Sequence, residues 1–272
     1  MNDDTPLDFT IVNKRLWNAK VDHHVKSPMY DVPGFLEGAD SLNSIELDLL
    51  GDIQGKRIIH LQCHFGLDTL SLARRGAQQV TGVDFSEKAI AKAEELAKKT
   101  NLTASTKFIC CNIFDLPDPE ELFDIVFASY GTICWLPDIN HWARILSNHL
   151  KPGGFSLLVE FHPFLDIFDE AYTRIENSYF NHGPIVCDCQ GTYADRNAPI
   201  RNKSMEWCHP VSSVIQALIQ NGLKIEVFKE FDYSPYDALL NSVKIADKCY
   251  QIKGLQGKIP IIYAIKASKP IS

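Results

Sequence analysis

The sequence has few of the features that point to a membrane, to secretion or to nucleic acid. Its first ten residues, MNDDTPLDFT, contain aspartates but no basic stretch and no apolar run, so we expect no signal peptide. No apolar stretch approaches the length that spans a bilayer. A net charge of -7 disfavours a broad phosphate-binding surface. We therefore expect a cytoplasmic protein that binds neither membranes nor nucleic acid.

Metal and disulfide signatures are also weak. The chain has 8 cysteines and no C-x-x-C pair. His182, Cys187, Cys189, Cys208 and His209 gather potential zinc ligands, but without the two closely spaced pairs of zinc motifs. A chain of 272 residues can bury a large core without disulfides. We interpret the cysteines as reduced thiols and expect no metal.

Glycine is scarce where a nucleotide-binding turn would need it. The segment QCHFG, residues 62–66, follows the first apolar run and has a single glycine, Gly66. A nicotinamide-binding fingerprint, G-x-G-x-x-G, is therefore missing. A metal site at His60, Cys63 and His64 is also disfavoured, because successive side chains along a strand point to opposite faces. The alternatives are a damaged nucleotide loop and a working loop with unusual side chains.

The segment from Lys56 to Lys151 alternates between two kinds of pattern. Short apolar runs predict strands over 57–63, 78–85, 105–112, 122–130 and 155–162. Helical spacing predicts helices over 67–76, 86–100 and 137–150, the second of them capped by Ser86. Apolar strands that alternate with helices in this way indicate right-handed βαβ units and a parallel sheet covered on both faces.

The rest of the chain suggests one α/β domain over 1–272. The alternation stops after His162 and resumes with a helix over 211–222 and strands over 223–231 and 258–269. The expected parts are an N-terminal cap and lead-in helix (1–55), a cofactor-binding core (56–161), an insertion or lid (162–206), and a C-terminal helix with strands (207–272).

A carboxylate stands at the end of the second predicted strand. In doubly wound sheets, ligands bind at the carboxyl ends of the strands, and an acid after the second strand accepts ribose hydroxyls. Asp84 has this position, and the turn at 62–66 precedes it at the end of the first strand. The order of strand, turn, helix, strand and acid therefore predicts a nucleoside ligand.

Three further segments carry a family resemblance: VTGVDFS (80–86), FDIVFAS (123–129) and LKPGGFSLLVE (150–160). With them the chain resembles the class I S-adenosylmethionine-dependent methyltransferases, well over Lys56 to Glu160 and weakly over the last two strands. The resemblance implies a Rossmann-like doubly wound sheet of seven strands, mostly parallel, with the last strand antiparallel. It also implies S-adenosylmethionine as cofactor.

The same resemblance implies cofactor-binding roles for particular residues. The turn residues would hold the methionine part, Asp84 the ribose, and Ser129 would lie beneath the sulfonium. The full set comprises Tyr30, Gln62, Cys63, His64, Gly66, Asp84, Phe85, Asn112, Ile113 and Ser129. The family usually has an acid at His60, glycines at Gln62 and His64, and often Asp at Asn112. We expect Gln62 and His64 to contact the cofactor without taking part in the chemistry.

The sequence gives weaker indications of the general base and of the residues that bind the methyl acceptor. In VEFHPF, His162 is the candidate general base, and its alternative role is to fix the turn before Pro163. Glu160 is expected to be structural or to orient His162. The candidate substrate-binding residues are Trp17, Tyr130, Tyr193, Arg196 and Trp207, with lid packing as the alternative role of the aromatic ones.

The resulting hypothesis is methyl transfer from S-adenosylmethionine to a small-molecule acceptor by in-line displacement. The alternative is a non-catalytic protein of the same fold that binds the cofactor as a sensor or partner subunit. ASYG (128–131) stands where methyltransferases of base or glutamine amino groups carry an N-P-P-Y-type tetrapeptide, which disfavours those acceptors. A homodimer is compatible with the sequence.

Overall fold

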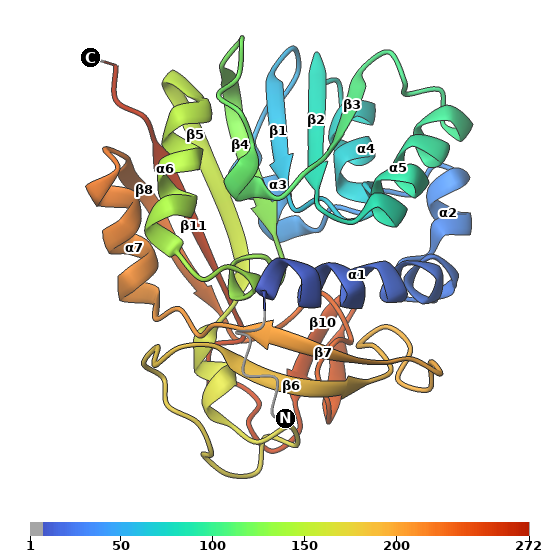
Figure 1. The fold of residues 1–272 in the computed structure, drawn as a ribbon, viewed down its shortest axis with the longest axis vertical. Helices are drawn as coiled ribbons and strands as arrows, with labels where there is room; N and C mark the ends of the chain where they lie inside the picture. Colours follow the sequence, from blue (N-terminus) through green and yellow to red (C-terminus); the bar gives the residue numbers. More distant parts are fainter. Residues whose placement is uncertain (1–7, 272) are drawn as a thin grey trace, which may run out of the picture.

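The computed structural model describes residues 8–271. A seven-stranded sheet of order β3-β2-β1-β4-β5-β11-β8 forms its centre (Figure 1). The parallel strands are β1 (Arg57–Leu61), β2 (Gln79–Asp84), β3 (Thr106–Cys110), β4 (Phe123–Ser129) and β5 (Leu150–Phe161). The last strand, β11 (Ile262–Ser268), runs antiparallel between β5 and β8 (Lys224–Phe231). This arrangement confirms the predicted sheet.

Helices cover both faces of the sheet, which explains why its central strands are apolar throughout. On one face lie α6 (Ile139–His149) and α7 (Val211–Gln220), whose Trp142 and Leu218 belong to one buried cluster with β4 and β5. On the other lie α3 (Ser44–Leu50), α4 (Leu67–Arg74) and α5 (Glu87–Lys99). Ser86 caps α5 as predicted, since its hydroxyl accepts a hydrogen bond from the Ala89 N–H at 3.1 Å.

The N-terminal segment crosses the carboxyl edge of the sheet. Helix α1 (Phe9–Lys26) lies along that edge in Figure 1, and α2 (Val32–Leu36) follows it. Asn13 joins α1 to the insertion, because its side chain donates to the Met205 carbonyl at 2.7 Å and accepts from the Met205 N–H at 2.9 Å. The cap and the insertion are thus held together over the strand ends.

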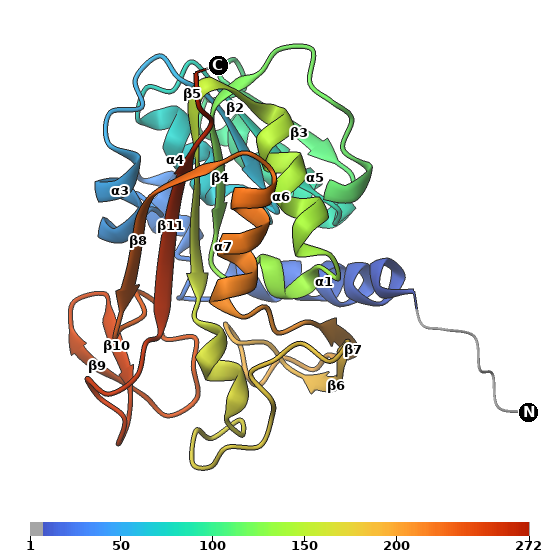
Figure 2. The ribbon, with the colours of Figure 1, turned by 90° about the vertical axis from the view of Figure 1, so that its left-hand side faces the viewer.

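Two hairpins that the sequence did not predict complete this edge. After β5 the chain forms the short helix η3 (Pro163–Ile167) and the antiparallel pair β6 (Ile185–Gln190) and β7 (Arg201–Glu206). Between β8 and β11 it forms β9 (Ser242–Ala246) and β10 (Cys249–Ile252). Figure 2 shows both hairpins below the ends of β5, β8 and β11. Among the described helices, none has the length and apolar character needed to cross a membrane.

Candidate active site

A cavity of about 1060 Å³ lies at the carboxyl edge of the parallel strands. The cap, the ends of β1 to β4, the insertion and the segment before β11 all contribute to its wall. Most of the residues predicted for the site line it: Trp17, Tyr30, Gln62, Cys63, His64, Gly66, Asp84, Phe85, Asn112, Ile113, Ser129, Tyr130, Tyr193 and Arg196. His162 and Trp207 do not.

The turn after β1 follows a left-handed path without the glycines that usually permit it. Gln62 has φ of 54° and His64 has φ of 51°, while Gly66 has φ of 79°. A non-glycine residue in this region costs about 1–2 kcal/mol. Part of that cost is offset by hydrogen bonds of the same turn, from the Cys63 N–H to the Val83 carbonyl and from the His64 N–H to Asp84, both at 2.9 Å.

Gly66 is the one position in this turn that packing reserves for glycine. A Cβ atom there would lie 2.8 Å from Cε1 of Phe108 and 2.9 Å from Cβ of Ala93. Both neighbours belong to buried or partly buried groups on β3 and α5, so neither can move away cheaply. The single retained glycine is therefore a requirement of close packing between the turn and its neighbours.

The side chains of Gln62 and His64 leave polar atoms unpaired in the cavity wall. Gln62 donates through Nε2 to the Thr132 carbonyl at 2.7 Å, and Nε2 of His64 lies 2.9 Å from Nδ1 of His24. Within residues 8–271, Gln62 Oε1 and His64 Nδ1 are buried and have no hydrogen-bond partner. Burial lowers the pKa of His64 to about 3, so the ring is neutral. Such unpaired atoms are costly and indicate a ligand that would satisfy them.

Asp84 organises the turn and still has capacity for a ligand. Its two oxygens accept hydrogen bonds from the Ser86 N–H at 2.8 Å and the His64 N–H at 2.9 Å. Burial raises the pKa of Asp84 to about 6, so the carboxylate is ionised at neutral pH. An ionised carboxylate offers about four acceptor positions, and two of them remain for hydroxyl groups.

The end of β3 supplies a polar and an apolar surface. Asn112 caps the short helix η1 (Ile113–Asp115), accepting from the Phe114 N–H at 3.1 Å, and its amide donates to Thr10 at 3.2 Å. Ile113 beside it is buried. This combination of an amide and an aliphatic wall suits a flat heteroaromatic ring.

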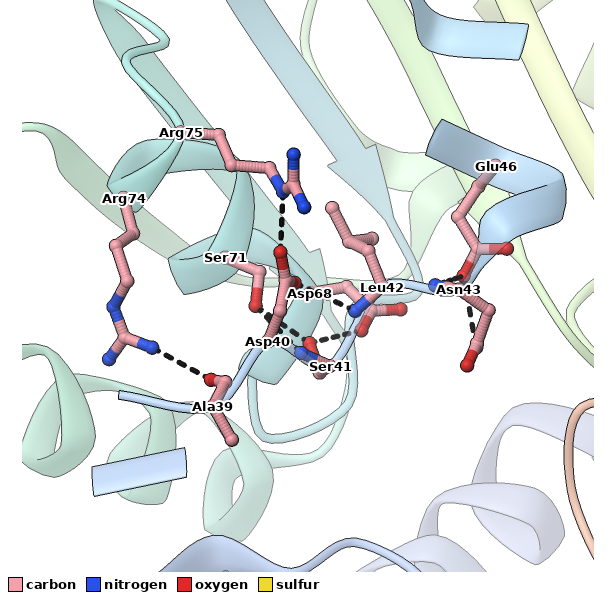
Figure 3. Close-up of polar contacts among 10 residues, drawn as sticks. All are labelled: Ala39, Asp40, Ser41, Leu42, Asn43, Glu46, Asp68, Ser71, Arg74 and Arg75. Carbon is pink, nitrogen blue, oxygen red and sulfur yellow. Dashed lines mark hydrogen bonds and ion pairs between the residues drawn. The ribbon is translucent and has the colours of Figure 1, made fainter. Parts of the chain in front are cut away.

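Asp68, which was not predicted from the sequence, lines the same cavity, and Figure 3 shows its contact with Ser41. It accepts hydrogen bonds from Ser41 at 2.6 Å and from Ser129 at 3.2 Å, and burial raises its pKa. The segment around Ser41 is fixed along α4, where Arg74 donates to the Ala39 carbonyl at 2.9 Å. In the sequence, the feature that points to Asp68 is its position in the first turn of α4 (Leu67–Arg74), directly after the turn that forms the cavity wall.

Glu46 adds a second buried carboxylate close to Asp68. Tyr130, whose ring lines the cavity, donates to Glu46 at 2.6 Å, and the Asn43 N–H donates to it at 2.8 Å. Burial, followed by the nearby Asp68, raises the pKa of Glu46 to about 7. This end of the cavity is therefore acidic, and its charge state changes near neutral pH.

Aromatic side chains from the cap and the insertion close the cavity. The hydroxyls of Tyr30 and Tyr193 lie 2.5 Å apart, and the ring of Trp17 lies 5.2 Å from His64 and 5.3 Å from Trp135. Arg196 donates to the Leu239 carbonyl at 2.9 Å, which joins the insertion to the segment before β9. These contacts join segments that are far apart in the chain and lie over the strand ends.

The structure corrects the expectation that His162 faces this cavity. His162 is 6% exposed and lines no part of it. Its Nε2 lies 3.0 Å from Glu230, and its Nδ1 accepts from the Phe164 N–H at 3.0 Å. These are the contacts of a residue that fixes the turn before Pro163, because both ring nitrogens are engaged away from the cavity.

Trp207 and Glu160 also have surroundings that the sequence could not specify. Trp207 lines a neighbouring smaller cavity, and its ring lies 5.5 Å from that of Phe9. Glu160 accepts hydrogen bonds from the N–H groups of Thr132 at 2.7 Å and Ile133 at 3.1 Å. It therefore shapes the loop after β4 and does not orient His162.

The cysteines and histidines form no metal centre in the part of the chain that the structure describes. His60 contacts Thr69 through Nδ1 at 2.9 Å and is buried. The 8 cysteines are unpaired.

Comparisons with known proteins agree with this geometry. Residues 58–154 match a family model described as a methyltransferase domain. A ubiquinone biosynthesis O-methyltransferase of Neisseria meningitidis serogroup C is 30% identical over 129 residues, which are 46% of this chain and 53% of that protein. The chain thus spans about half the length of the curated relative.

Solved structures share the fold at low sequence identity. A putative S-adenosylmethionine-dependent methyltransferase from Listeria monocytogenes has a TM-score of 0.61 and 18% identity, covering 82% of this chain and 94% of its own. The [4+2]-cyclase SpnF has a TM-score of 0.62 and 15% identity, covering 98% and 99%. The fold alone therefore does not decide the reaction. Residues 58–154 therefore match a methyltransferase domain, and the strand order around them is the fold shared with the solved methyltransferase structure from Listeria monocytogenes.

Proposed function

We propose that this protein is an enzyme that transfers a methyl group from S-adenosylmethionine to a small-molecule acceptor. The observation that carries the proposal is the cavity at the strand ends, where ionised Asp84 keeps free acceptor positions next to the unpaired atoms of Gln62 and His64. Its volume of about 1060 Å³ is at the upper end of ligand pockets, which leaves room for a cofactor and an acceptor.

Different residues of the cavity wall would bind the ribose, the adenine and the methionine part of the cofactor. Asp84 would accept the ribose hydroxyls, while Phe85, Asn112 and Ile113 would bind adenine. Gln62, His64 and Tyr30 would surround the methionine part, with Cys63 and Gly66 shaping the turn and Ser129 near the sulfur. When bound, S-adenosylmethionine supplies an electrophilic methyl group on a positively charged sulfur.

The protein's own contribution is to position the acceptor and to exclude water. In-line transfer requires a nucleophile held within attack distance and aligned with the bond that breaks. Trp17, Tyr130, Tyr193 and Arg196 line the side of the cavity formed by cap, loop and insertion, and Trp207 lines the adjoining cavity. These residues would bind the acceptor, and the contact between Tyr30 and Tyr193 would keep the reacting groups away from solvent.

Calorimetric titration tests the proposal at its first step. We expect S-adenosylhomocysteine to bind the wild-type protein and NAD not to bind. Asp84→Asn should weaken S-adenosylhomocysteine binding by about tenfold or more, because a hydrogen bond to a charged group contributes about 1.5–3 kcal/mol. Asp115→Asn is the matched control, since Asp115 is exposed and lies outside the cavity. Absence of binding to the wild type would refute the proposal.

Turnover separates an enzyme from a sensor of the same fold. Radiolabelled S-adenosylmethionine with a panel of small acceptors should give labelled product and S-adenosylhomocysteine. Cofactor binding without product on any acceptor would favour the non-catalytic alternative.

A further inference from the structure

A second cavity of about 310 Å³ adjoins the first. The two cavities meet at the loop after β4, the end of β5 and the segment before β9, because both are lined by Gly131, Cys134, Phe161 and Leu239. The remaining wall comes from η3, the hairpin of β6 and β7, and β11. We call this space the side cavity. A group bound in it would reach the main cavity past Gly131.

Three carboxylates face the side cavity: Glu160, Asp166 and Glu206. The charge of Glu160 is stabilised by backbone N–H groups, including that of Phe161 at 2.7 Å. Asp166 and Glu206 have no such set. Among the ion pairs of residues 8–271, none includes any of the three. The side cavity therefore concentrates negative charge without a paired cation.

Tyr263 gives an independent sign that a polar ligand is missing. The side chain is 0% exposed, it lines the side cavity, and its hydroxyl has no hydrogen-bond partner in the described chain. An unpaired buried hydroxyl costs about 1–3 kcal/mol. A ligand that donates hydrogen bonds would satisfy its oxygen. The apolar part of the wall, which includes Trp207 and Leu165, suits a carbon skeleton.

The surrounding charges favour a cation over a neutral donor. Asp166 is exposed at the rim of the side cavity, and neighbouring protein atoms, followed by the carboxylates of Glu206 and Glu160, raise the pKa of its carboxyl to about 7. Lys20 is the buried lysine of this region, and its ammonium is held over the rings of Trp17 at 4.6 Å and Trp135 at 5.3 Å. Glu206 is the main charge that acts on Lys20, but the two groups form no direct ion pair in the described residues. An ammonium ligand has three donors and a charge, which match two carboxylates and the oxygen of Tyr263.

We propose that the side cavity binds the ammonium group of the methyl acceptor, held between Asp166, Glu206 and Tyr263. The inference rests on the proposed function and names its acceptor class: a small organic amine that anchors through its charged nitrogen. The atom to be methylated then lies at the other end of the molecule, toward Gly131 and the main cavity. The anchoring nitrogen stays protonated and is not the nucleophile.

Binding of matched probes tests this assignment. The protein is saturated with S-adenosylhomocysteine and titrated with benzylamine and phenethylamine, and with the neutral benzyl alcohol and phenethyl alcohol, followed by ligand-observed NMR. We expect each amine to bind about tenfold or more tightly than its alcohol, since hydrogen bonds to a charged group are the stronger kind. Equal binding of amine and alcohol, or no saturable binding of either amine up to about 10 mM, overturns the assignment.

Variants locate the binding. Asp166→Asn and Glu206→Gln should each weaken amine binding by about tenfold and leave alcohol binding unchanged. Tyr263→Phe removes only a hydroxyl that has no partner in the described chain, so it should fold and weaken amine binding several-fold. Glu170→Gln is the control, since Glu170 is an exposed acid of the same insertion outside the cavity. Unchanged amine binding in Asp166→Asn and Glu206→Gln refutes the site. If the wild type does not bind S-adenosylhomocysteine, that result instead refutes the proposed function.

Discussion

The hydroxyls of Tyr30 and Tyr193 lie 2.5 Å apart, although 162 residues separate them in the chain. Tyr30 comes from the N-terminal cap and Tyr193 from the insertion, and both line the main cavity. The contact joins the two segments that do not belong to the common βα core. Asn13 and Met205 form a second link between the same segments. The cover of the site is therefore a single hydrogen-bonded unit made from the N-terminal cap and the insertion after β5.

The tyrosine pair should contribute measurably to stability. Tyr193→Phe leaves the buried hydroxyl of Tyr30 unpaired and should lower the free energy of unfolding by about 1–3 kcal/mol. The double variant Tyr30→Phe/Tyr193→Phe removes both hydroxyls and should be less destabilised than the sum of the two single variants. Urea denaturation of the four proteins measures this coupling. Additive losses would show that the two hydroxyls do not interact.

Removing a glycine and adding one in the turn after β1 should affect stability differently. Gly66→Ala should lower the free energy of unfolding by about 2–4 kcal/mol, since it adds a Cβ in a crowded left-handed position. Gln62→Gly relieves left-handed strain of about 1 kcal/mol but deletes the hydrogen bond to Thr132. We expect it to be near neutral for stability and to weaken S-adenosylhomocysteine binding. Thermal denaturation and calorimetry distinguish these results; unchanged affinity in Gln62→Gly would show that its side chain does not contact the cofactor.

The same turn shows what the sequence could and could not reveal. Alternating apolar strands and helices predicted the sheet, and Asp84 after β2 was recognisable because its position follows from topology. The sequence could not explain why position 66 requires glycine, because that requirement comes from the packing of Phe108 and Ala93 against the turn. Strain at Gln62 and His64 is likewise a tertiary property, offset by contacts with distant residues such as Asp84 and Thr132.

Residues far from the common motifs were the hardest to place. His162 follows β5 at the expected edge, but the direction of its side chain depends on Glu230 of a strand near the end of the chain. Asp68 stands in the first turn of α4, but its partners, Ser41 and Ser129, come from separate elements. The hairpin of β9 and β10 has no strong alternation, since its residues are largely exposed or half-buried. Local sequence patterns do not encode such long-range neighbours.

Cofactor affinity should depend on the ionisation of Asp84. Burial raises the pKa of Asp84 to about 6, and only the ionised form accepts two hydroxyl hydrogen bonds. Affinity for S-adenosylhomocysteine should therefore rise between pH 5 and pH 7 and level off above. The stability of the unliganded protein changes in the opposite sense, because a raised native pKa means that folding binds protons. This group's contribution to stability is largest at low pH and falls as pH rises through about 4 to 6.

Calorimetry with S-adenosylhomocysteine at pH 5, 6 and 7 measures the first effect. In Asp84→Asn the affinity should be low at all three values, without the rise that this carboxylate causes. A rise of equal size in the variant would assign the pH dependence to another group, for which Glu46 with its pKa of about 7 is the next candidate.

Replacing His162 should affect stability and leave the chemistry intact. His162→Gln removes contacts to Glu230 and the Phe164 N–H and should cost about 1–3 kcal/mol of unfolding free energy. Burial lowers the pKa of His162 despite Glu230, so the native ring takes up its proton at a lower pH than the unfolded one, which is protonated below about pH 6.5. Its contribution is therefore present above that pH and is lost as pH falls. Urea denaturation at pH 7.5 and 5.5 measures how much unfolding free energy each protein loses as pH falls. This loss should be smaller for His162→Gln than for wild type, and His182→Gln, which replaces an exposed histidine, should behave like wild type.

In His162→Gln the affinity for S-adenosylhomocysteine should be unchanged, and turnover per folded molecule should stay within about twofold of wild type. A general base would instead lose about 10²–10⁴ in rate, and such a loss would restore His162 to the catalytic machinery.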